Sequence, residues 1–268
     1  MDSRPIGIFD SGLGGLTAAA ALMALAPEED LIYFGDSANA PYGTKSREEL
    51  LHLATANAAF LREFDVKAIL VACGTVSSTV IGQVRQRCPV PMFDVVEAPC
   101  RAFARSGGRR AAVAATEATI RSGAFSRRLR QLCPDAEICA KSCQSLVSVA
   151  EAGHLDCGDP VAEAAVAAEF GPIRDFQPET VLLACTHFPL LQGPIRAFLG
   201  PEVALLSVGA EAAAALASYL RENGLLAPEK GREGHRRWFT SGDPAVFSRY
   251  AGPFLGRSVK AEYHANGI

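Results

Sequence analysis

The sequence predicts an α/β protein with two pseudo-symmetric lobes, each a mostly parallel sheet flanked by helices, and an active site in the cleft between the lobes. Three observations predict this fold. Short apolar runs alternate with alanine- and leucine-rich stretches, a pattern typical of strands that helices cover on both faces. Two of the apolar runs end alike, in Ala72-Cys73 and in Ala184-Cys185, each with a threonine close behind. About half of the 268 residues are hydrophobic (49%), which suffices for a sizeable core.

The first half of the chain predicts four strands with helices between them. The strands are the apolar runs Ile6–Phe9, Leu31–Phe34, Ile69–Ala72 and Val90–Asp94. The helices are expected over Leu16–Ala26, from Ser46 to about Phe64, and over Val76–Arg87. Alanine and leucine favour the first of these helices. Ser46 is a typical N-cap and has two glutamates close behind it, which favours the start of the second helix there.

The second half of the chain repeats this alternation. Its strands are expected over Arg109–Ala115, Glu137–Ser142, Val181–Ala184 and Val203–Val208. Helical segments are expected over Ser122–Leu132, Ser145–Ala152 and Pro160–Phe170, from near Pro189–Pro194, and from Gly209 to about Asn223. Each half thus starts with a strand that ends in a polar cluster, Asp10-Ser11 in the first and Thr116–Thr119 in the second.

The last part of the chain is too short to form a third domain. A loop-like stretch at Gly224–Glu233 precedes a strand at Arg236–Thr240, a helix at Ala245–Leu255 and a strand at Val259–Tyr263. We expect this tail to return and complete the first lobe. The predicted division is therefore a first lobe of residues 1–96 plus 208–268, which carries Cys73, and a second lobe of residues 97–207, which carries Cys185.

Composition excludes several classes of function. The net charge of −3, without any basic run, argues against binding to nucleic acid or to an anionic membrane surface. The N-terminus enters a strand directly, without a signal peptide, and no apolar run is long enough to span a bilayer, so we expect a cytoplasmic protein. The eight cysteines contain no C-x-x-C pair and are expected to be thiols, with no metal site.

The glycine-rich turn after the first strand is not a dinucleotide fingerprint. Gly12 and Gly14 fit that pattern, but Thr17 occupies the position of its third glycine. The turn is better explained as a helix N-terminus whose amides and positive dipole end can hold a carboxylate. Asp10 and Ser11 would then contact the bound group.

The two Ala-Cys strands place two thiols where ligands gather. Ligands of open α/β sheets bind at the carboxyl ends of the strands, so Cys73 and Cys185 are expected to face one cleft from opposite sides. Two thiols can exchange with a disulfide, bind a metal, or transfer protons on the two faces of one carbon. Redox exchange needs adjacent or resolving thiols, and a metal needs further ligands. Proton transfer needs only two bases and amides that hold a carboxylate, as Gly74-Thr75 and Thr186-His187 can.

These residues resemble a known family. The motifs are Asp10-Ser11-Gly12, Pro41-Tyr42-Gly43, Cys73 with Thr75, and Cys185-Thr186-His187 followed by Pro189-Leu190. Together they resemble the glutamate racemases of the cofactor-independent aspartate/glutamate racemase superfamily, over most of the chain. The resemblance implies interconversion of L- and D-glutamate without pyridoxal phosphate or another cofactor, a supply of D-glutamate for peptidoglycan, and a homodimer.

The resemblance also implies roles for single residues. Cys73 would take the α-proton from D-glutamate and Cys185 from L-glutamate. Asp10 matches an acidic residue beside the first cysteine, and Glu151 and His187 match residues near the second. The matched substrate-contact positions are Asp10, Ser11, Tyr42, Gly43, Gly74, Thr75, Thr186 and His187, and Thr116 and Thr119 are expected to line the same cleft.

Several simpler interpretations stay open. Asp10 could cap the first helix, His187 could bond to a carbonyl, Tyr42 could pack within its loop, and Glu151 could be a solvated helix residue. Thr116 and Thr119 could be helix caps. Two positions depart from the family pattern: Gly74 stands where asparagine is usual, and Phe188 where tyrosine is common. Alternative functions are racemisation of another amino acid such as aspartate, or non-catalytic binding of an amino acid by a regulator.

Overall fold

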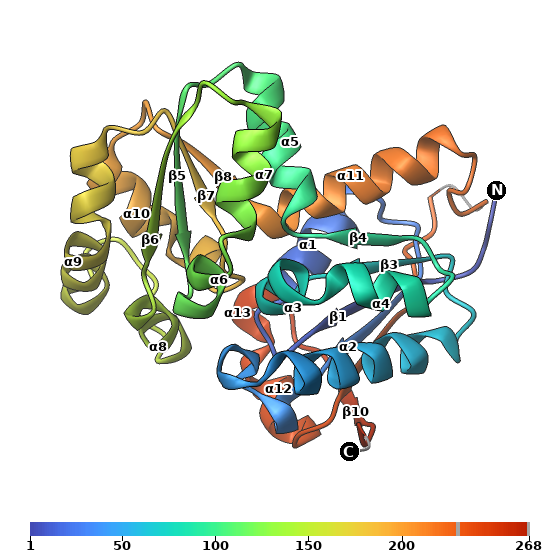
Figure 1. Ribbon diagram of the computed structural model, residues 1–268. Coiled ribbons are helices and arrows are strands. Elements are labelled where there is room, and N and C mark those ends of the chain that lie inside the picture. Colours follow the sequence, from blue (N-terminus) through green and yellow to red (C-terminus); the bar gives the residue numbers. More distant parts are fainter. Residues whose placement is uncertain (229–230, 267–268) are drawn as a thin grey trace.

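The computed structural model describes residues 1–228 and 231–266, and in them the chain forms two parallel sheets flanked by helices (Figure 1). The first sheet has six strands in the order β10-β9-β2-β1-β3-β4, and the second has four in the order β6-β5-β7-β8. All of their pairings are parallel. The predicted fold class is confirmed.

The strands of the first sheet are β1 (Ile6–Asp10), β2 (Leu31–Gly35), β3 (Ala68–Val71), β4 (Met92–Asp94), β9 (Arg236–Thr240) and β10 (Ala261–Tyr263). Those of the second are β5 (Arg110–Ala115), β6 (Glu137–Ser142), β7 (Thr180–Leu183) and β8 (Ala204–Ser207). The α-helices are α1 (Leu16–Leu25), α2 (Arg47–Arg62), α3 (Gly74–Thr79), α4 (Ile81–Arg87), α5 (Glu97–Ser106), α6 (Glu117–Ser122), α7 (Ala124–Leu132), α8 (Ser145–Glu151), α9 (Pro160–Phe176), α10 (Gln192–Leu199), α11 (Val208–Glu222), α12 (Pro244–Tyr250) and α13 (Gly252–Leu255). The 3-10 turns of the described residues are η1 (Ser37–Asn39), η2 (Tyr42–Thr44) and η3 (Phe188–Leu191).

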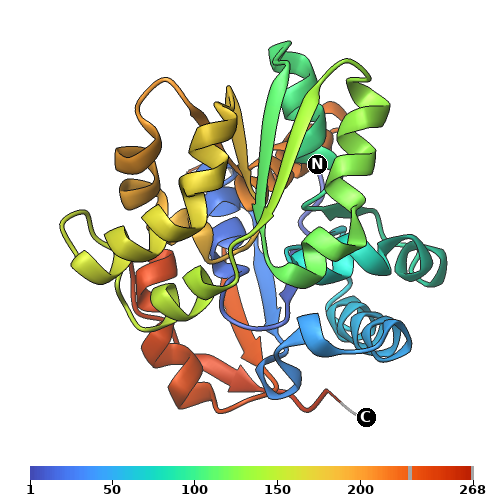
Figure 2. The same cartoon turned by 60° about the vertical axis from the view of Figure 1, so that its left-hand side comes forward.

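The chain ends share the first sheet. Strand β9 pairs with β2, and β10 pairs with β9, so the C-terminal strands lie beside the blue strands of the start of the chain (Figure 2). The division into residues 1–96 plus 208–268 and residues 97–207 stays a prediction. The predicted loop Gly224–Glu233 includes residues 229–230, which lie outside the described residues.

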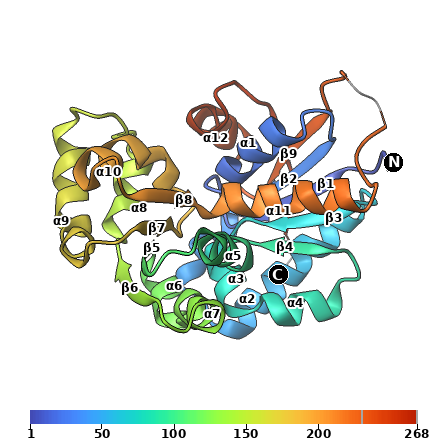
Figure 3. The ribbon, with the colours of Figure 1, turned by 90° about the horizontal axis from the view of Figure 1, so that it is seen from above.

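One apolar cluster connects the two sheets. It includes Ile8 and Leu70 of the first sheet and Val113 and Leu182 of the second, all buried. Helices α1, α5 and α11 supply the side chains between them, and α11 runs from β8 along α1 (Figure 3). Strands β1, β2 and β3 are buried throughout, because helices cover both faces of the sheet. In residues 1–228 and 231–266, no helix has the length and apolar character needed to cross a membrane.

Helix boundaries differ from the prediction in several places. The expected helix Val76–Arg87 is two helices, because the backbone leaves helical geometry at Val80 (φ −124°, ψ −2°), within a run of β-branched residues that favour the helix less. A second break falls at Gly123, whose left-handed φ of 64° ends α6. The expected helix Ala245–Leu255 is also two helices, α12 and α13. The sequence pattern does not predict α5, and α9 continues past its predicted end at Phe170 to Phe176.

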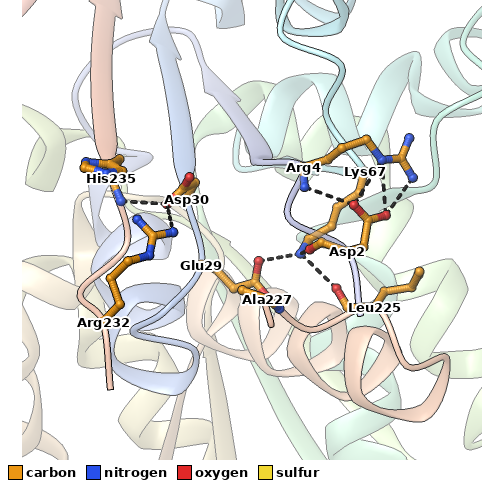
Figure 4. A network of polar contacts seen from close by, with 9 residues as sticks. All are labelled: Asp2, Arg4, Glu29, Asp30, Lys67, Leu225, Ala227, Arg232 and His235. Carbon is orange, nitrogen blue, oxygen red and sulfur yellow. Dashed lines mark hydrogen bonds and ion pairs between the residues drawn. The ribbon is translucent and has the colours of Figure 1, made fainter. Parts of the chain in front are cut away.

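A buried ion pair closes the first sheet at the amino ends of its strands (Figure 4). Lys67 Nζ lies 2.5 Å from Glu29 Oε2, and the two side chains are 0% and 2% exposed. The ammonium also donates to the carbonyls of Asp2 (2.7 Å) and Leu225 (2.8 Å). Glu29 Oε1 accepts from the amide of Ala227 at 2.8 Å. The pair therefore ties the N-terminus and the segment after α11 to the sheet, opposite the carboxyl ends where the candidate site lies.

Candidate active site

The carboxyl ends of strands from both sheets border one cavity of about 920 Å³. Every residue that the sequence analysis assigns to the site lines this cavity: Asp10, Ser11, Tyr42, Gly43, Cys73, Gly74, Thr75, Thr116, Thr119, Glu151, Cys185, Thr186 and His187. They come from segments far apart in the chain, which parallel topology brings to a common edge. The sequence pattern does not predict Tyr250, Pro253 and Phe254 here, yet α12 and α13 bring them to the wall of the cavity.

Cys73 stands between β3 and α3 and is 3% exposed. Burial raises the pKa of its thiol to about 12, and the negative charge of Asp10 adds to this effect. Hydrogen bonds from the amides of Val76 and Thr75 and from the hydroxyl of Ser11 act in the opposite direction but do not outweigh burial. In the unliganded protein at neutral pH, Cys73 therefore holds its proton.

Asp10 ends β1 and serves both the fold and the cavity. Its side chain is 3% exposed, and Oδ2 accepts from the amide of Gly15 at 2.7 Å, in the turn that starts α1. A Cβ at Gly15 would lie 2.5 Å from Asp10 Cβ and 2.9 Å from the hydroxyl of Tyr33, so the close approach requires glycine. Asp10 thus bonds to the turn that starts α1, as the helix-capping interpretation expects. It also lies close enough to Cys73 for its charge to affect the thiol.

Cys185 follows β7 and has an imidazole beside it. His187 Nδ1 lies 3.8 Å from Cys185 Sγ, and His187 Nε2 lies 3.2 Å from Glu151 Oε1. Burial by itself would lower the pKa of His187, but hydrogen bonds and charge from Cys185 and Glu151 outweigh it and raise the pKa to about 10. The hydrogen bond to His187 in turn lowers the pKa of Glu151, although burial opposes the shift. His187 is therefore a cation at neutral pH.

The two thiols consequently have opposite electrostatic surroundings. Cys73 lies beside a carboxylate, whereas Cys185 lies beside an imidazolium. A neighbouring anion favours the protonated thiol, and a neighbouring cation favours the thiolate. The arrangement can supply a proton from one side of the cavity and accept one on the other.

The loop 37–44 lines the cavity, but the hydroxyl of Tyr42 is engaged elsewhere. Tyr42 is 1% exposed; its hydroxyl donates to Asp36 Oδ2 at 2.5 Å and accepts from Asn57 Nδ2 at 3.0 Å. Burial and the nearby Asp36 raise the pKa of Tyr42. The loop-packing interpretation therefore applies to this hydroxyl. Asp36 is not among the predicted site residues, although an aspartate at the carboxyl end of a buried strand repeats the pattern of Asp10.

Thr116 and Thr119 bring hydroxyls to the cavity from the second lobe. Thr116 is the N-cap of α6 but makes no side-chain capping bond; its hydroxyl donates to Thr119 Oγ1 at 3.2 Å. A Cβ at Gly74 would lie 3.4 Å from the carbonyl oxygen of Ala184 and 3.6 Å from Thr119 Oγ1, which is ordinary contact. Phe188 is fully buried in the core of the second lobe. The absence of a tyrosine hydroxyl at this position therefore affects that core.

The two lobes touch directly beneath the site. Thr17 Oγ1 donates to the carbonyls of Gly14 (2.9 Å) and of Thr186 (3.3 Å). A Cβ at Gly14 would lie 2.1 Å from Thr186 Oγ1 and 3.1 Å from His187 Cε1. The turn that carries Cys185 therefore rests against the start of α1.

All eight cysteines lie in the described residues and are free thiols in the structure. Six of them, Cys88, Cys100, Cys133, Cys139, Cys143 and Cys157, lie outside the cavity lining. Within the described part of the chain, no three His, Cys, Asp or Glu side chains form a group that could hold a metal ion.

Fold and site together define a class of two-lobed α/β protein in which each lobe contributes one thiol to a shared cavity. The chain belongs to the Asp/Glu/Hydantoin racemase family, whose profile matches residues 17–221. It is 37% identical to the glutamate racemase of Geobacter metallireducens, over 99% of this chain and 98% of that protein.

Solved structures show the same relation. The glutamate racemase of Francisella tularensis in complex with D-glutamate is 33% identical, with a TM-score of 0.88 over 99% of this chain and 98% of the other. The glutamate racemase of Thermus thermophilus in complex with β-chloro-D-alanine is 38% identical, with a TM-score of 0.86 over the same shares.

Proposed function

We propose that this protein is a glutamate racemase that interconverts L- and D-glutamate by proton transfer between Cys73 and Cys185. The observation that carries the proposal is the pair of thiols, one from each lobe, in one cavity with opposite neighbouring charges. Full-length relatives named glutamate racemase and a similar structure that holds D-glutamate support glutamate as the substrate.

In the direction from L to D, Cys185 acts first. Its thiolate takes the proton from Cα of L-glutamate, and the electron pair of the broken C–H bond moves into the α-carboxylate. The thiol of Cys73 then donates its proton to the opposite face of Cα, which forms D-glutamate and leaves Cys73 as thiolate. The reverse direction exchanges the two roles. Each step is general acid–base catalysis by a thiol that lines the cavity.

The neighbouring residues serve the two thiols and the substrate. The imidazolium of His187, held by Glu151, stabilises negative charge on Cys185. Burial, with the charge of Asp10 in addition, keeps Cys73 protonated until the carbanion forms. We expect the amides at Gly74-Thr75 and Thr186-His187, residues that line the cavity, to hold the α-carboxylate as charge develops on it. Hydroxyls of Ser11, Thr116 and Thr119 offer further hydrogen bonds.

The decisive experiment follows L-glutamate in D2O by proton NMR, with a chiral assay for D-glutamate. The wild-type protein is expected to remove the α-proton signal and to form D-glutamate without an added cofactor. Cys73→Ala and Cys185→Ala are each expected to abolish racemisation and to keep the circular dichroism spectrum of the wild type. A fully active single variant would refute the two-base mechanism. Glutamate binding without α-proton exchange would support a regulator, and faster turnover of aspartate would support the other alternative.

The setting of the activity belongs to the same proposal. We propose that the protein acts in the cytoplasm, where D-glutamate would enter peptidoglycan synthesis, and that it is a homodimer. Light scattering of the purified protein tests the homodimer, since a monomer at micromolar concentration would contradict it.

A further inference from the structure

The buried carboxylate of Asp36 joins the cavity loop to the C-terminal segment. Asp36 is 0% exposed and directly follows β2. Besides Tyr42, it accepts hydrogen bonds from Asn39 Nδ2 (3.0 Å), from the hydroxyl of Ser241 (2.6 Å) and from Asn266 Nδ2 (2.8 Å). All of these donors are neutral. Because a buried carboxylate is costly without partners, the donors and the acceptor hold one another in place.

Asn266 closes a ring of hydrogen bonds in this network. Its Nδ2 group donates both to Asp36 Oδ2 at 2.8 Å and to Asn57 Oδ1 at 2.7 Å. Asn57 Nδ2 donates to the hydroxyl of Tyr42, and that hydroxyl donates back to Asp36. Each of the four side chains therefore contacts two others, and removal of Asn266 leaves one acceptor on Asn57 and one on Asp36 without this donor.

The segment after β10 is anchored so that Asn266 reaches this ring. The amide of His264 donates to the carbonyl of Thr240 at 2.9 Å. Its imidazole stacks on the ring of Phe60, with centroids 3.7 Å apart and planes 21° apart, and meets the edge of Phe34. Two residues further on, Asn266 lies against α2 and the end of β2.

The cavity loop depends on side chains for its position. In the described chain, the backbone-to-backbone hydrogen bonds of the amides of residues 38–45 reach only to residues 36–42. The connections from this loop to other segments include Tyr42 with Asn57, and the amide of Ala38 with the hydroxyl of Ser241 at 3.0 Å. Loop residues 40–44 line the cavity. A change in the network at Asp36 would therefore move the cavity wall.

We propose that Asn266 is a positioning residue for substrate binding, which acts by holding Tyr42 and the loop 37–44 against the cavity through Asp36 and Asn57. The inference rests on the proposed function in that the bound substrate is glutamate. It predicts a defect in binding, not in the proton transfers, because Cys73 and Cys185 lie on other segments.

Asn266→Ala tests the inference, with Asn223→Ala as the matched control. The control removes a side-chain amide that, among the contacts described, bonds only to the carbonyl of Tyr219 in α11, the helix whose C-cap is Asn223. We expect Asn266→Ala to raise KM for both enantiomers about five- to tenfold, as the loss of one or two hydrogen bonds would. The kcat should stay within about twofold, and Tm within about 3 °C of the control. Asn266→Asp should raise KM further, because it places a second carboxylate beside Asp36.

Hydrogen–deuterium exchange gives a second readout that does not need turnover. Peptides covering residues 37–44 should exchange faster in Asn266→Ala than in the wild type or in Asn223→Ala. An unchanged KM of Asn266→Ala would overturn the inference, whether or not its Tm is lower. If the wild-type protein does not racemise glutamate, the proposed function fails, and the exchange of residues 37–44 then decides the inference alone: unchanged exchange overturns it.

Discussion

Replacing Gly14 with alanine tests whether the contact between the lobes positions the second thiol. Gly14 precedes α1, and its Cα faces Thr186, the residue between Cys185 and His187. An added Cβ would lie 2.1 Å from Thr186 Oγ1 and 2.8 Å from Thr186 Cβ. Rotation of the threonine hydroxyl relieves only the first of these contacts. The second forces the backbone of the turn to retreat.

The size of the effect follows from that distance. Since Cβ atoms rarely approach other heavy atoms closer than about 3.4 Å, the turn must move by roughly half an ångström. A misplacement of 1 Å at a reacting group costs about 100-fold in rate, so we expect kcat/KM to fall between about 10- and 100-fold. Overpacking of this kind lowers the free energy of unfolding by about 1–3 kcal/mol, which leaves the protein folded at 25 °C.

The assay compares kcat/KM of Gly14→Ala with that of Gly82→Ala, in both directions, by circular dichroism of glutamate. Gly82 lies in α4, where nothing stands within 4 Å of an added Cβ, so this variant carries the same substitution without the clash. The two enantiomers have equal free energies, so kcat/KM must change by the same factor in both directions. If Gly14→Ala kept kcat/KM within twofold of the control, the contact would have no part in positioning the turn.

Substitutions of His187, Gly74 and Lys67 test other parts of the structure. His187→Gln should lower kcat about 100-fold. The raised pKa of His187 stabilises the wild-type fold below pH 6.5, and this contribution is lost as pH rises through about 10. The variant should therefore have a lower free energy of unfolding than the wild type at neutral pH, and the difference should narrow toward pH 10; a constant difference would contradict the assignment. Gly74→Asn should fold, since an added Cβ makes only ordinary contacts. It should also lower KM for glutamate, because its side-chain amide adds a hydrogen-bond donor at the cavity wall; an unchanged or higher KM in steady-state kinetics would reject this. Lys67→Met leaves Glu29 buried without its partner and should cost about 3–5 kcal/mol in denaturant unfolding, with kcat/KM per folded molecule unchanged; a loss below about 1 kcal/mol would mean that the pair is dispensable.

The positions of the two thiols could be predicted because they depend on local patterns and a general rule of topology. An apolar run that ends in a small polar residue is a buried strand with its carboxyl end at that residue. In parallel sheets, such ends share one edge. Cys73 and Cys185 are both next to such ends, and so are Asp10 and Thr116. Their arrival at one cavity therefore follows from the order of strands and helices along the chain.

The network around Asp36 could not be predicted in the same way. Asn266 is polar and lies beyond the last strand, and nothing in its neighbourhood in the sequence distinguishes it. Its contacts with Asp36 and Asn57 depend on where β10 joins the first sheet, which is a tertiary event. The contact of Gly14 with Thr186 is likewise invisible, because a glycine in a turn has a local explanation in its backbone freedom. The break at Val80 could not be predicted either, because the lower helix propensity of β-branched residues is too small to locate the end of a helix.

The difference between the lobes is what the proposed reaction requires. Were both thiols beside carboxylates, as Cys73 is beside Asp10, both neighbours would favour the protonated form, and the unliganded protein would lack a base for the first step. Were both beside cations, both neighbours would favour the thiolate, and a proton donor for the carbanion would be disfavoured. One protonated thiol and one sulfur beside a cation make the unliganded protein ready for L-glutamate. Once that turnover has moved a proton from one side to the other, the protein is ready for D-glutamate. A two-lobed fold therefore suits racemisation because each lobe contributes one thiol and the neighbours of the two thiols carry opposite charge.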